Sequence, residues 1–152
     1  MQNLVSVLAE HPFFQDLEPS HLELLAKFTT DARFEVGQVL FRQEEEANHF
    51  YVIRQGRVAL ELVAPRGFIT VQTVDAGEVL GWSWLVPPHR WRFQARAVEP
   101  TRAVALDGKR LRAECEANPD LGYQLLKHFV QIMAQRLEAT RLQLADLVGA
   151  RS

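Results

Sequence analysis

The sequence lacks the features of a secreted or membrane-spanning protein. Its single cysteine, Cys115, cannot form an internal disulfide, which is typical of a reducing compartment. Its apolar runs are short and interrupted by charges, far below the ~20 residues that a membrane span needs. The N-terminus has no basic start followed by an apolar stretch, so it does not resemble a secretion signal. We therefore expect a cytoplasmic protein without a membrane partner.

The sequence also lacks motifs for catalysis and metal binding. Its five histidines are scattered, and none stands with cysteine or carboxylate residues at the spacing of a zinc site. It has no phosphate loop, nucleophile elbow or pair of catalytic carboxylates. Glu114 and Glu116 flank Cys115 and raise a thiol pKa, which argues against a reactive cysteine. We predict no enzyme activity, no catalytic residues, no metal and no resident cofactor.

The charge balance gives no general attraction to nucleic acid. The chain has 17 Lys and Arg against 19 Asp and Glu, a net charge of −2. The acidic run Glu44 to Glu46 is interpreted as a solvated loop. We expect no nucleic-acid binding by this chain alone.

The length and composition predict one domain over residues 1–152. With 152 residues, of which 47% are hydrophobic, the chain is long enough to bury a core. Residues 3–11 carry apolar residues at helical spacing before Pro12, and a second helix is predicted over roughly 19–29 with Ser20 or Asp16 as its cap. Residues 1–29 are therefore predicted to be N-terminal helices.

From Thr30 the apolar residues alternate, which is the pattern of short β-strands. The alternating residues are Phe34, Val36, Val39, Phe41, Phe50, Val52, Val58, Leu60 and Leu62, and strands resume at 93–98 and 102–106. Breaks fall at Gly37, 44–46, 55–56 and 65–67, and the last predicts a hairpin turn between 60–62 and 69–71. The pattern predicts a mainly β fold with flanking helices, with a barrel, sandwich or β-roll over residues 30–107.

The C-terminal part, residues 108–152, reads as helical. A short helix is predicted over 108–116, and a long one begins at Asn118-Pro119, a cap followed by proline at the first helical position. Its basic residues, Lys127, Arg136, Arg141 and Arg151, are interspersed with acids and are interpreted as a solvated face.

The long helix carries two apolar stripes. One falls at alternating four- and three-residue steps and predicts a dimer seam over residues 118–148; its members are Leu126, Val130, Met133, Leu137, Thr140, Leu144 and Leu147. The other, Leu125, Phe129 and Ile132, suits packing on the helix's own domain. We favour a helix that packs on its own domain early and pairs with a second copy late.

Residues 77–97, GEVLGWSWLVPPHRWRFQARA, contain all three tryptophans of the chain. The glycines permit unusual backbone angles, and Pro87-Pro88 excludes a long helix, so the segment is predicted to be a shaped loop with room for one helical turn. The tryptophans are interpreted either as a dense mini-core or as the wall of an aromatic pocket.

Four stretches in this order resemble the cyclic-nucleotide-binding domain of the catabolite-activator and protein-kinase-regulatory type. Its N-terminal helical entry is similar to HPFFQDLEPSHLELLAKF, and its first strands are similar to FEVGQVLFRQEEEANHFYVIRQGRVALEL. Its phosphate-binding cassette stands where this chain has GEVLGWSWL, and its closing strands and hinge helix resemble ARAVEPTRAVALD and the long helix that follows. The resemblance covers nearly the whole chain and implies a Crp-Fnr-type sensor domain with a double-stranded β-helix, a jelly-roll-like and cupin-like β-roll.

In that family a short cassette helix presents backbone N–H groups to the cyclic phosphate, an arginine pairs with the phosphate, and a glutamate binds the ribose 2′-hydroxyl. A gap-free match makes Gly81 the cassette glycine. It puts Trp82 at the glutamate position, Trp84 at a small residue and Trp91 at the arginine position. Both polar anchors are therefore replaced by indoles, which carry no charge and only donate a hydrogen bond.

Other residues of the same segment offer substitutes for these two anchors. Arg90 and Arg92 flank Trp91, and a one-residue shift brings either guanidinium to the pocket, while Trp82 or Trp84 is able to stack on a base. Losing a buried arginine–phosphate pair costs about 3 to 5 kcal/mol of the ~8 that micromolar affinity requires, and a stacked tryptophan restores only about 1 to 3. We therefore expect no tight cAMP binding. The predicted ligand-binding residues are Gly77, Glu78, Gly81, Trp82, Ser83, Trp84, Leu85, Arg90, Trp91 and Arg92.

These observations predict a regulatory sensor module that acts as a homodimer through an altered small ligand or a protein partner. A further interpretation is a self-filled pocket, in which Trp84 and Trp91 take the place of the nucleotide. The loop tip at residues 87–90 is interpreted as a contact site for a protein partner. One alternative is a Crp-Fnr-type transcriptional regulator relative without its own helix-turn-helix, since the sequence ends at Ser152. The other is a ligand-free protein-interaction domain. A gel shift with genomic DNA distinguishes the first alternative from the sensor module. A thermal shift with metabolites distinguishes the second alternative from it.

Overall fold

The structure is a computed structural model that describes residues 4–81 and 83–149. Its helices are α1 (Leu4–Glu10), the short 3-10 helix η1 (Pro12–Phe14), α2 (Pro19–Ala26), α3 (Gly108–Ala117) and α4 (Pro119–Gly149). Its strands are β1 (Thr29–Phe34), β2 (Val39–Phe41), β3 (His49–Gln55), β4 (Arg57–Ala64), β5 (Gly67–Asp75), β6 (Val79–Leu80), β7 (Gln94–Ala97) and β8 (Thr101–Asp107).

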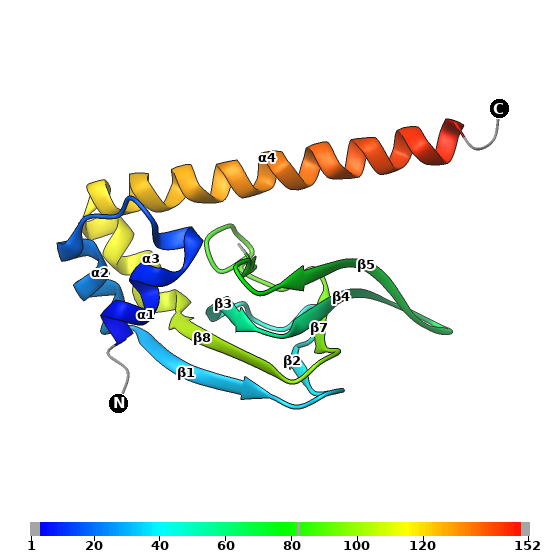
Figure 1. The fold of residues 1–152 in the computed structure, drawn as a ribbon, viewed down its shortest axis with the longest axis horizontal. Helices are drawn as coiled ribbons and strands as arrows, with labels where there is room; N and C mark the ends of the chain where they lie inside the picture. The colour runs from blue at the N-terminus through cyan, green and yellow to red at the C-terminus, as the bar shows by residue number, and fades with distance from the viewer. Residues whose placement is uncertain (1–3, 82, 150–152) are drawn as a thin grey trace.

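The strands form two four-stranded antiparallel sheets. One has the order β1-β8-β3-β6 and the other β2-β7-β4-β5. The N-terminal helices lie at one end of the sheets, and α4 starts at that end and runs along the molecule (Figure 1). Both sheets bury the apolar members of the alternating pattern, such as Phe50, Val52, Val58 and Leu60. The predicted mainly β fold with flanking helices, a β-roll, is confirmed.

The β4–β5 hairpin forms where the turn residues predict it. Leu62 pairs with Ile69 and Ala64 with Gly67, which leaves Pro65 and Arg66 as the turn. The hairpin reaches outward in the same direction as the end of α4 (Figure 1).

Three details of the N-terminal half differ from prediction. The second helix ends at Ala26 rather than near residue 29, because Thr29 already pairs with Leu106 of β8. Neither Ser20 nor Asp16 caps it: Glu18 is the N-cap residue without a side-chain hydrogen bond, and Pro19 occupies the first helical position, where a missing N–H costs nothing. Val36 lies in the turn after β1 and is exposed.

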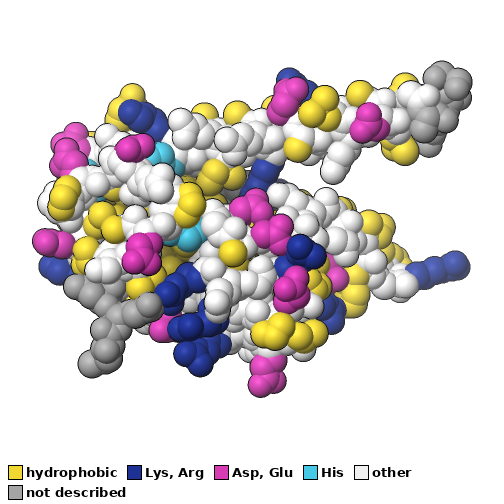
Figure 2. Space-filling view, in the orientation of Figure 1, with side chains coloured by type: hydrophobic (Ala, Val, Ile, Leu, Met, Phe, Trp, Pro, Cys, Tyr) yellow, Lys and Arg dark blue, Asp and Glu magenta, His cyan; other side chains and the backbone are white. Residues whose placement is uncertain are grey.

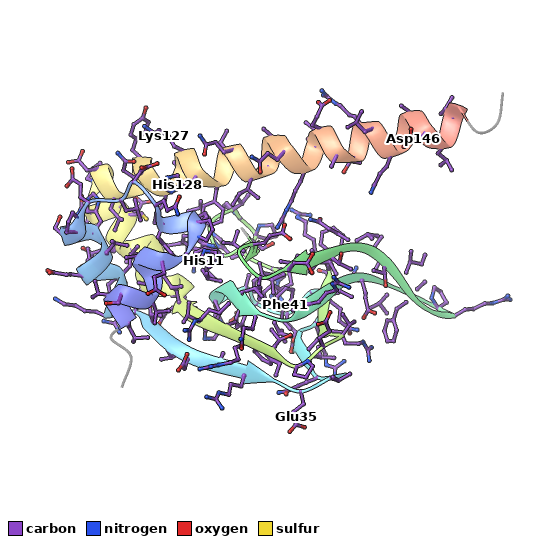
Figure 3. All side chains as sticks on the ribbon, in the orientation of Figure 1. His11, Glu35, Phe41, Lys127, His128 and Asp146 are labelled. Atoms are coloured by element: carbon purple, nitrogen blue, oxygen red, sulfur yellow. The ribbon has the colours of Figure 1, made fainter. Side chains whose placement is uncertain are left out.

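An aromatic junction joins the N-terminal segment, β3 and α4. The ring of Phe13 lies 5.2 Å from that of Phe50 and 5.0 Å from that of Phe129, and both contacts are edge-on. His11 and His128 stand on the two sides of this junction (Figure 3). His11 is buried; its Nδ1 accepts the Phe13 N–H at 3.2 Å, and its Nε2 bonds the Ile53 carbonyl at 3.1 Å. Burial lowers the pKa of His11, and the bond to Ile53 opposes that shift.

Helix α4 begins as the Asn118-Pro119 signal predicts, with the Asn118 side chain accepting the Leu121 N–H at 3.4 Å. Its first turns pack on the molecule through the buried residues Leu121, Leu125 and Phe129, with Ile132 half-buried beside them. The prediction that this stripe lies on its own domain is confirmed. No helix within residues 4–81 and 83–149 is long and apolar enough to cross a membrane.

Helix α3 packs closely on the start of α4. A Cβ atom at Gly122 would lie 3.1 Å from the Cys115 carbonyl oxygen, so only glycine allows this approach without a shift of the helices. Burial raises the pKa of the Cys115 thiol to about 11, and Glu114 and Glu116 add to the shift. The predicted direction of that shift is confirmed, although burial contributes more than the neighbouring charges.

Candidate functional site

The cassette segment is held at its start by β6 and continues as a series of turns. Leu80 and Val79 pair with Tyr51 and Val52 of β3. Residues 83–88 form turns and bends, and no helical turn forms in residues 83–97, in contrast to the prediction. Trp82 lies outside the described residues. The described part of the cassette therefore has no helix N-terminus that would present backbone N–H groups to a phosphate.

Gly81 leaves room for the ring of Trp91. Its backbone is left-handed, with φ of +84°, and a Cβ atom added there would overlap the Trp91 ring. The sequence match assigns Gly81 to the cassette glycine and Trp91 to the arginine position. In the structure these two residues are in direct contact. Glycine is needed here both for the backbone angle and for the ring.

The Trp91 ring fills the inner pocket beside the cassette. It is 4% exposed and stacks on Phe41 of β2, with ring centroids 3.7 Å apart and planes at 12°. Its backbone is fixed by bonds from the Trp91 N–H to the Glu45 carbonyl and from the Glu44 N–H to the Trp91 carbonyl. The remaining pocket, lined by Leu60, Gly81, Ser83, Arg92 and Phe93 among others, has a volume of about 50 Å³. That is space for one or two water molecules.

Trp84 belongs to the core and not to this pocket. It is fully buried, and its ring lies 5.8 Å from both Phe50 and Phe129, in the aromatic junction under α4. Its indole N–H is buried without a hydrogen-bond partner. Of the two tryptophans in the self-filled interpretation, Trp91 alone lies in the inner pocket, while Trp84 packs in the mini-core. Leu85 is partly buried against the same core.

The two flanking arginines point to different places. Arg90 is exposed, forms a β-bridge with Glu46 and donates from Nη1 to the Glu44 carbonyl at 2.9 Å, so it faces the acidic turn and not the pocket. Arg92 is also exposed but lines the rim of the inner pocket, beside Ser83. Of the two arginines predicted as substitutes for the phosphate-pairing arginine, Arg92 lines the inner pocket and Arg90 does not.

Glu78 closes the turn after β5. Its Oε1 accepts the Asp75 N–H at 2.9 Å, so the carboxylate caps this turn. Gly77, with φ of +89°, begins the cassette, and its N–H donates to the Ile53 carbonyl at 3.0 Å. Neither residue lines the inner pocket. Both line a separate, wider cleft of about 450 Å³ between α4 and the β-roll.

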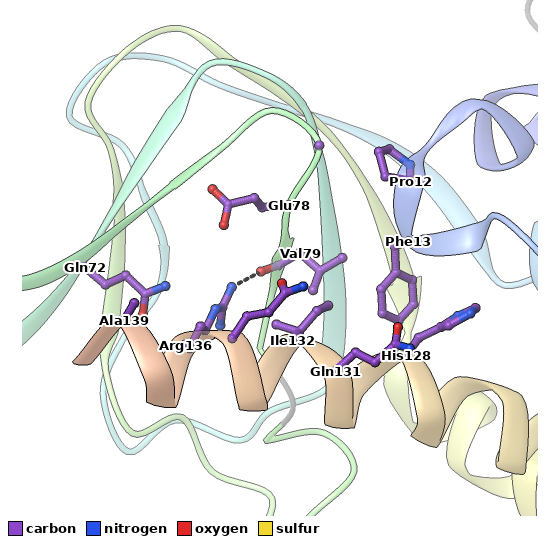
Figure 4. A pocket seen from close by; sticks show the side chains of 12 residues that line it. Pro12, Phe13, Gln72, Glu78, Val79, His128, Gln131, Ile132, Arg136 and Ala139 are labelled. Atoms are coloured by element: carbon purple, nitrogen blue, oxygen red, sulfur yellow. Dashed lines mark hydrogen bonds between the residues drawn. The ribbon is translucent and has the colours of Figure 1, made fainter. Parts of the chain in front are cut away.

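Arg136 of α4 lies between this cleft and the inner pocket and lines both. It reaches from the helix to β6 and donates from Nη2 to the Val79 carbonyl at 2.9 Å (Figure 4). Burial lowers the pKa of its guanidinium, and the nearby Glu78 carboxylate raises it. The interpretation of Arg136 as part of a solvated face is wrong: the residue fastens the long helix to the cassette strand.

This architecture is similar to that of known proteins. The family model described as "Cyclic nucleotide-binding domain" matches residues 32–118, more than half of the chain. The chain belongs to the cyclic nucleotide-binding domain family. A relative within the family, the "CRP-like cAMP-activated global transcriptional regulator" of Mycobacterium tuberculosis, is 29% identical over 143 residues. The match spans 93% of this chain and 62% of the length of that relative.

Solved structures of the family agree in fold. A candidate cyclic nucleotide-binding protein from Geobacter metallireducens superposes with a TM-score of 0.81 at 28% identity, over 90% of this chain and 99% of the other. The catabolite activator protein of Thermus thermophilus gives a TM-score of 0.68 at 25% identity, over 90% of this chain and 62% of the other. The chain is thus a cyclic nucleotide-binding regulatory domain related to CRP-type regulators.

Proposed function

We propose that this domain is a regulatory module that does not hold cAMP in the manner its family resemblance implies, and that it responds to another small ligand or to a protein partner. The supporting observation is the Trp91 ring, stacked on Phe41 where the match expects the phosphate-pairing arginine. Small-molecule sites occupy about 300 to 1,000 Å³. The inner pocket retains about 50 Å³.

The electrostatics of the inner pocket support the same proposal. Among the described residues that line it, Arg92 and Arg136 are cationic; Arg92 lies at the exposed rim, and Arg136 donates to the Val79 carbonyl. No described lining residue is a carboxylate that would accept a hydrogen bond from a ribose hydroxyl. A cyclic nucleotide entering this pocket would have to displace a buried indole before it met either arginine.

Titration of the purified protein with cAMP and cGMP, followed by tryptophan fluorescence and calorimetry, tests this proposal. We expect no saturable change at micromolar nucleotide. The variant W91A removes the indole ring from the inner pocket without adding a cation. We expect that it also does not bind cAMP or cGMP. The double variant W82E/W91R restores both family anchors and should gain at least about tenfold in cAMP affinity, since a charged pair at a buried site contributes more than that.

Two results would count against the proposal. Saturable micromolar binding by the natural protein means that the indole moves aside and that Arg92 or Arg136 binds the phosphate. A folded double variant that shows no gain means that Trp91 does not occupy the arginine position, so the assignment of the pocket fails. Circular dichroism of each variant separates loss of binding from loss of fold.

We further propose that the module is a homodimer through α4. The six apolar residues of the predicted seam are between 44% and 59% exposed on a single copy: Leu126, Val130, Met133, Leu137, Leu144 and Leu147. Their four- and three-residue steps suit pairing with a second helix of the same kind. Covering these side chains removes a contiguous apolar stripe from water, which supports association.

A second candidate function is the sensor part of a transcriptional regulator. The match to the Mycobacterium tuberculosis regulator, of which this chain spans 62%, favours it. A gel shift with genomic DNA tests this candidate: a salt-sensitive shift supports the regulator.

A further inference from the structure

A row of hydrogen-bond donors crosses the sheet outside the inner pocket of the cassette. Arg33 of β1 lies directly opposite Arg102 of β8, and Gln55 of β3 lies opposite Arg102 on its other side. Residues directly opposite in an antiparallel sheet have Cα atoms about 4.5 to 5.5 Å apart and point to the same face. Figure 2 shows Lys and Arg side chains gathered over β1 and β8. The two arginine side chains therefore stand side by side on one surface, and Gln55 lies next to Arg102 at an irregularity in the β3–β8 pairing.

The two arginines of this row lack an acidic partner. Within residues 4–81 and 83–149, neither Arg33 nor Arg102 forms a salt bridge, whereas Arg54 on the same face pairs with Asp31 at 3.7 Å. Like charges directly opposite each other destabilise a sheet. A bound anion would remove this repulsion.

Arg102 and Gln55 line a cleft of about 450 Å³ between α1 and the sheet. Val7 and Pro12 give it apolar walls. The remaining ionisable residues of its lining are Glu10, His11 and Arg54. Burial holds the pKa of His11 low, and both of its ring nitrogens are engaged, so it adds no charge near neutral pH.

The end of the sheet that carries this row is rigid. A Cβ atom at Gly56, directly after Gln55, would lie 2.6 Å from the Thr101 Oγ1, and the backbone there is left-handed with φ of +100°. Thr101 in turn donates from Oγ1 to the Glu99 carbonyl at 2.9 Å. Gln55 and Arg102 are therefore presented by two chain segments that are locked together, which lowers the entropy lost when both bind one ligand.

We propose that a small phosphomonoester binds at the edge of this cleft, with its phosphate held between Arg102, which lines the cleft, and Arg33, its cross-strand neighbour on β1. A guanidinium group matches the oxygens of a phosphate in a forked geometry, and two of them balance the double charge of a phosphomonoester. The Gln55 amide supplies a further donor, and the organic part of the ligand lies against Val7 and Pro12. This site is separate from the cassette pocket and does not depend on the function proposed for it.

Calorimetric titration with phenyl phosphate tests the proposal, because this probe combines the phosphate with an apolar body. We expect saturable binding that weakens about tenfold or more in R33Q and in R102Q. The matched control R66Q, at the tip of the β4–β5 hairpin, should bind as the natural protein does. Binding should also weaken below about pH 6, where the phosphate takes up its second proton. Glu10→Gln removes a negative charge from the cleft and should tighten binding.

The stability of the ligand-free protein gives an independent readout. Because the two arginines repel each other, R33Q should unfold at the same or a higher temperature than the natural protein, which also shows that it folds. Absence of binding by phenyl phosphate would overturn the proposal, and so would equal affinities of R33Q, R102Q and R66Q. Equal binding of benzoate at matched concentration would show a site for any organic anion and would contradict the assignment to phosphate.

Discussion

At the scale of single residues, Gly81 and Trp91 act as one unit. The ring of Trp91 lies where a side chain at position 81 would begin, and Phe41 supports the ring from the other side. The resemblance implies a pocket that is open for a nucleotide. Here the stacked rings of Trp91 and Phe41 fill that pocket. The closure depends on the absence of one Cβ atom.

The variant G81A tests this unit, and G37A is its matched control. Both glycines have left-handed backbones, with φ of +84° and +88°, but a Cβ atom at Gly37 meets nothing within 4 Å. We expect G37A to lower the free energy of unfolding by about 1 to 2 kcal/mol for the backbone alone. G81A should lose about 1 to 3 kcal/mol more, because its methyl group overlaps the Trp91 ring. Urea unfolding measures both, and equal losses would contradict the tight Gly81–Trp91 packing.

The sequence predicts the loss of the cassette anchors, but it does not predict which arginines face the pocket. Residue type alone shows that Trp91 cannot pair with a phosphate as an arginine does. The direction of Arg90 depends on its bridge to Glu46, a contact 44 positions away in the chain, and the role of Arg136 depends on where α4 crosses β6. The only sequence signal for Arg136 was its place beside Ile132, four residues back on the same face of the helix.

At the scale of elements, α4 combines three surfaces. Leu125 and Phe129 pack on the junction, Arg136 binds β6, and the seam faces solvent. The sequence predicts the first and the third because apolar residues recur at helical steps. It predicts the long strands for the same reason, since the alternating period is strong in β4 and β5. The two-residue strand β6 and the early end of α2 escape prediction, because strand pairing alone sets them.

The seam predicts a dimer that one charge disrupts. Leu144→Glu places a carboxylate on the seam and should weaken dimerisation at least about tenfold, because a buried unpaired charge is costly. Leu142→Glu makes the same chemical change at a residue of similar exposure, 59% against 56%, on the opposite face of the helix. It should leave the dimer intact. Sedimentation equilibrium measures both, and a monomeric natural protein or equal effects of the two variants would refute the seam.

At the scale of the whole molecule, one junction ties the N-terminal segment to the β-roll and the long helix. His11 bonds the Ile53 carbonyl of β3, and His128 of α4 contacts the Phe13 ring. Burial is the main cause that lowers the pKa of both histidines below the ordinary value of 6.5. Protonation of either one therefore opposes the folded arrangement of all three parts.

This junction predicts stability that declines in mild acid. Because the pKa of His11 is lower in the folded state, the unfolded state binds more protons below pH 6.5. The contribution is fully present above pH 6.5 and is lost as the pH falls toward the folded-state pKa, at no more than about 1.4 kcal/mol per pH unit. Urea unfolding between about pH 7.5 and 5.5 should show this decline. His11→Asn should make it shallower, and an unchanged slope in that variant would assign the decline to other groups.

The bond from Arg136 to Val79 also makes the long helix a lever. Every described residue beyond Arg136 is exposed, so the bond is the outermost fixed point of a helix 31 residues long. From Arg136 to Gly149 the helix extends about 20 Å, and a tilt of about 10° at that point moves its end by about 3.5 Å. A small rotation of the helix about its attachment to β6 therefore produces its largest displacement at the far end of the helix.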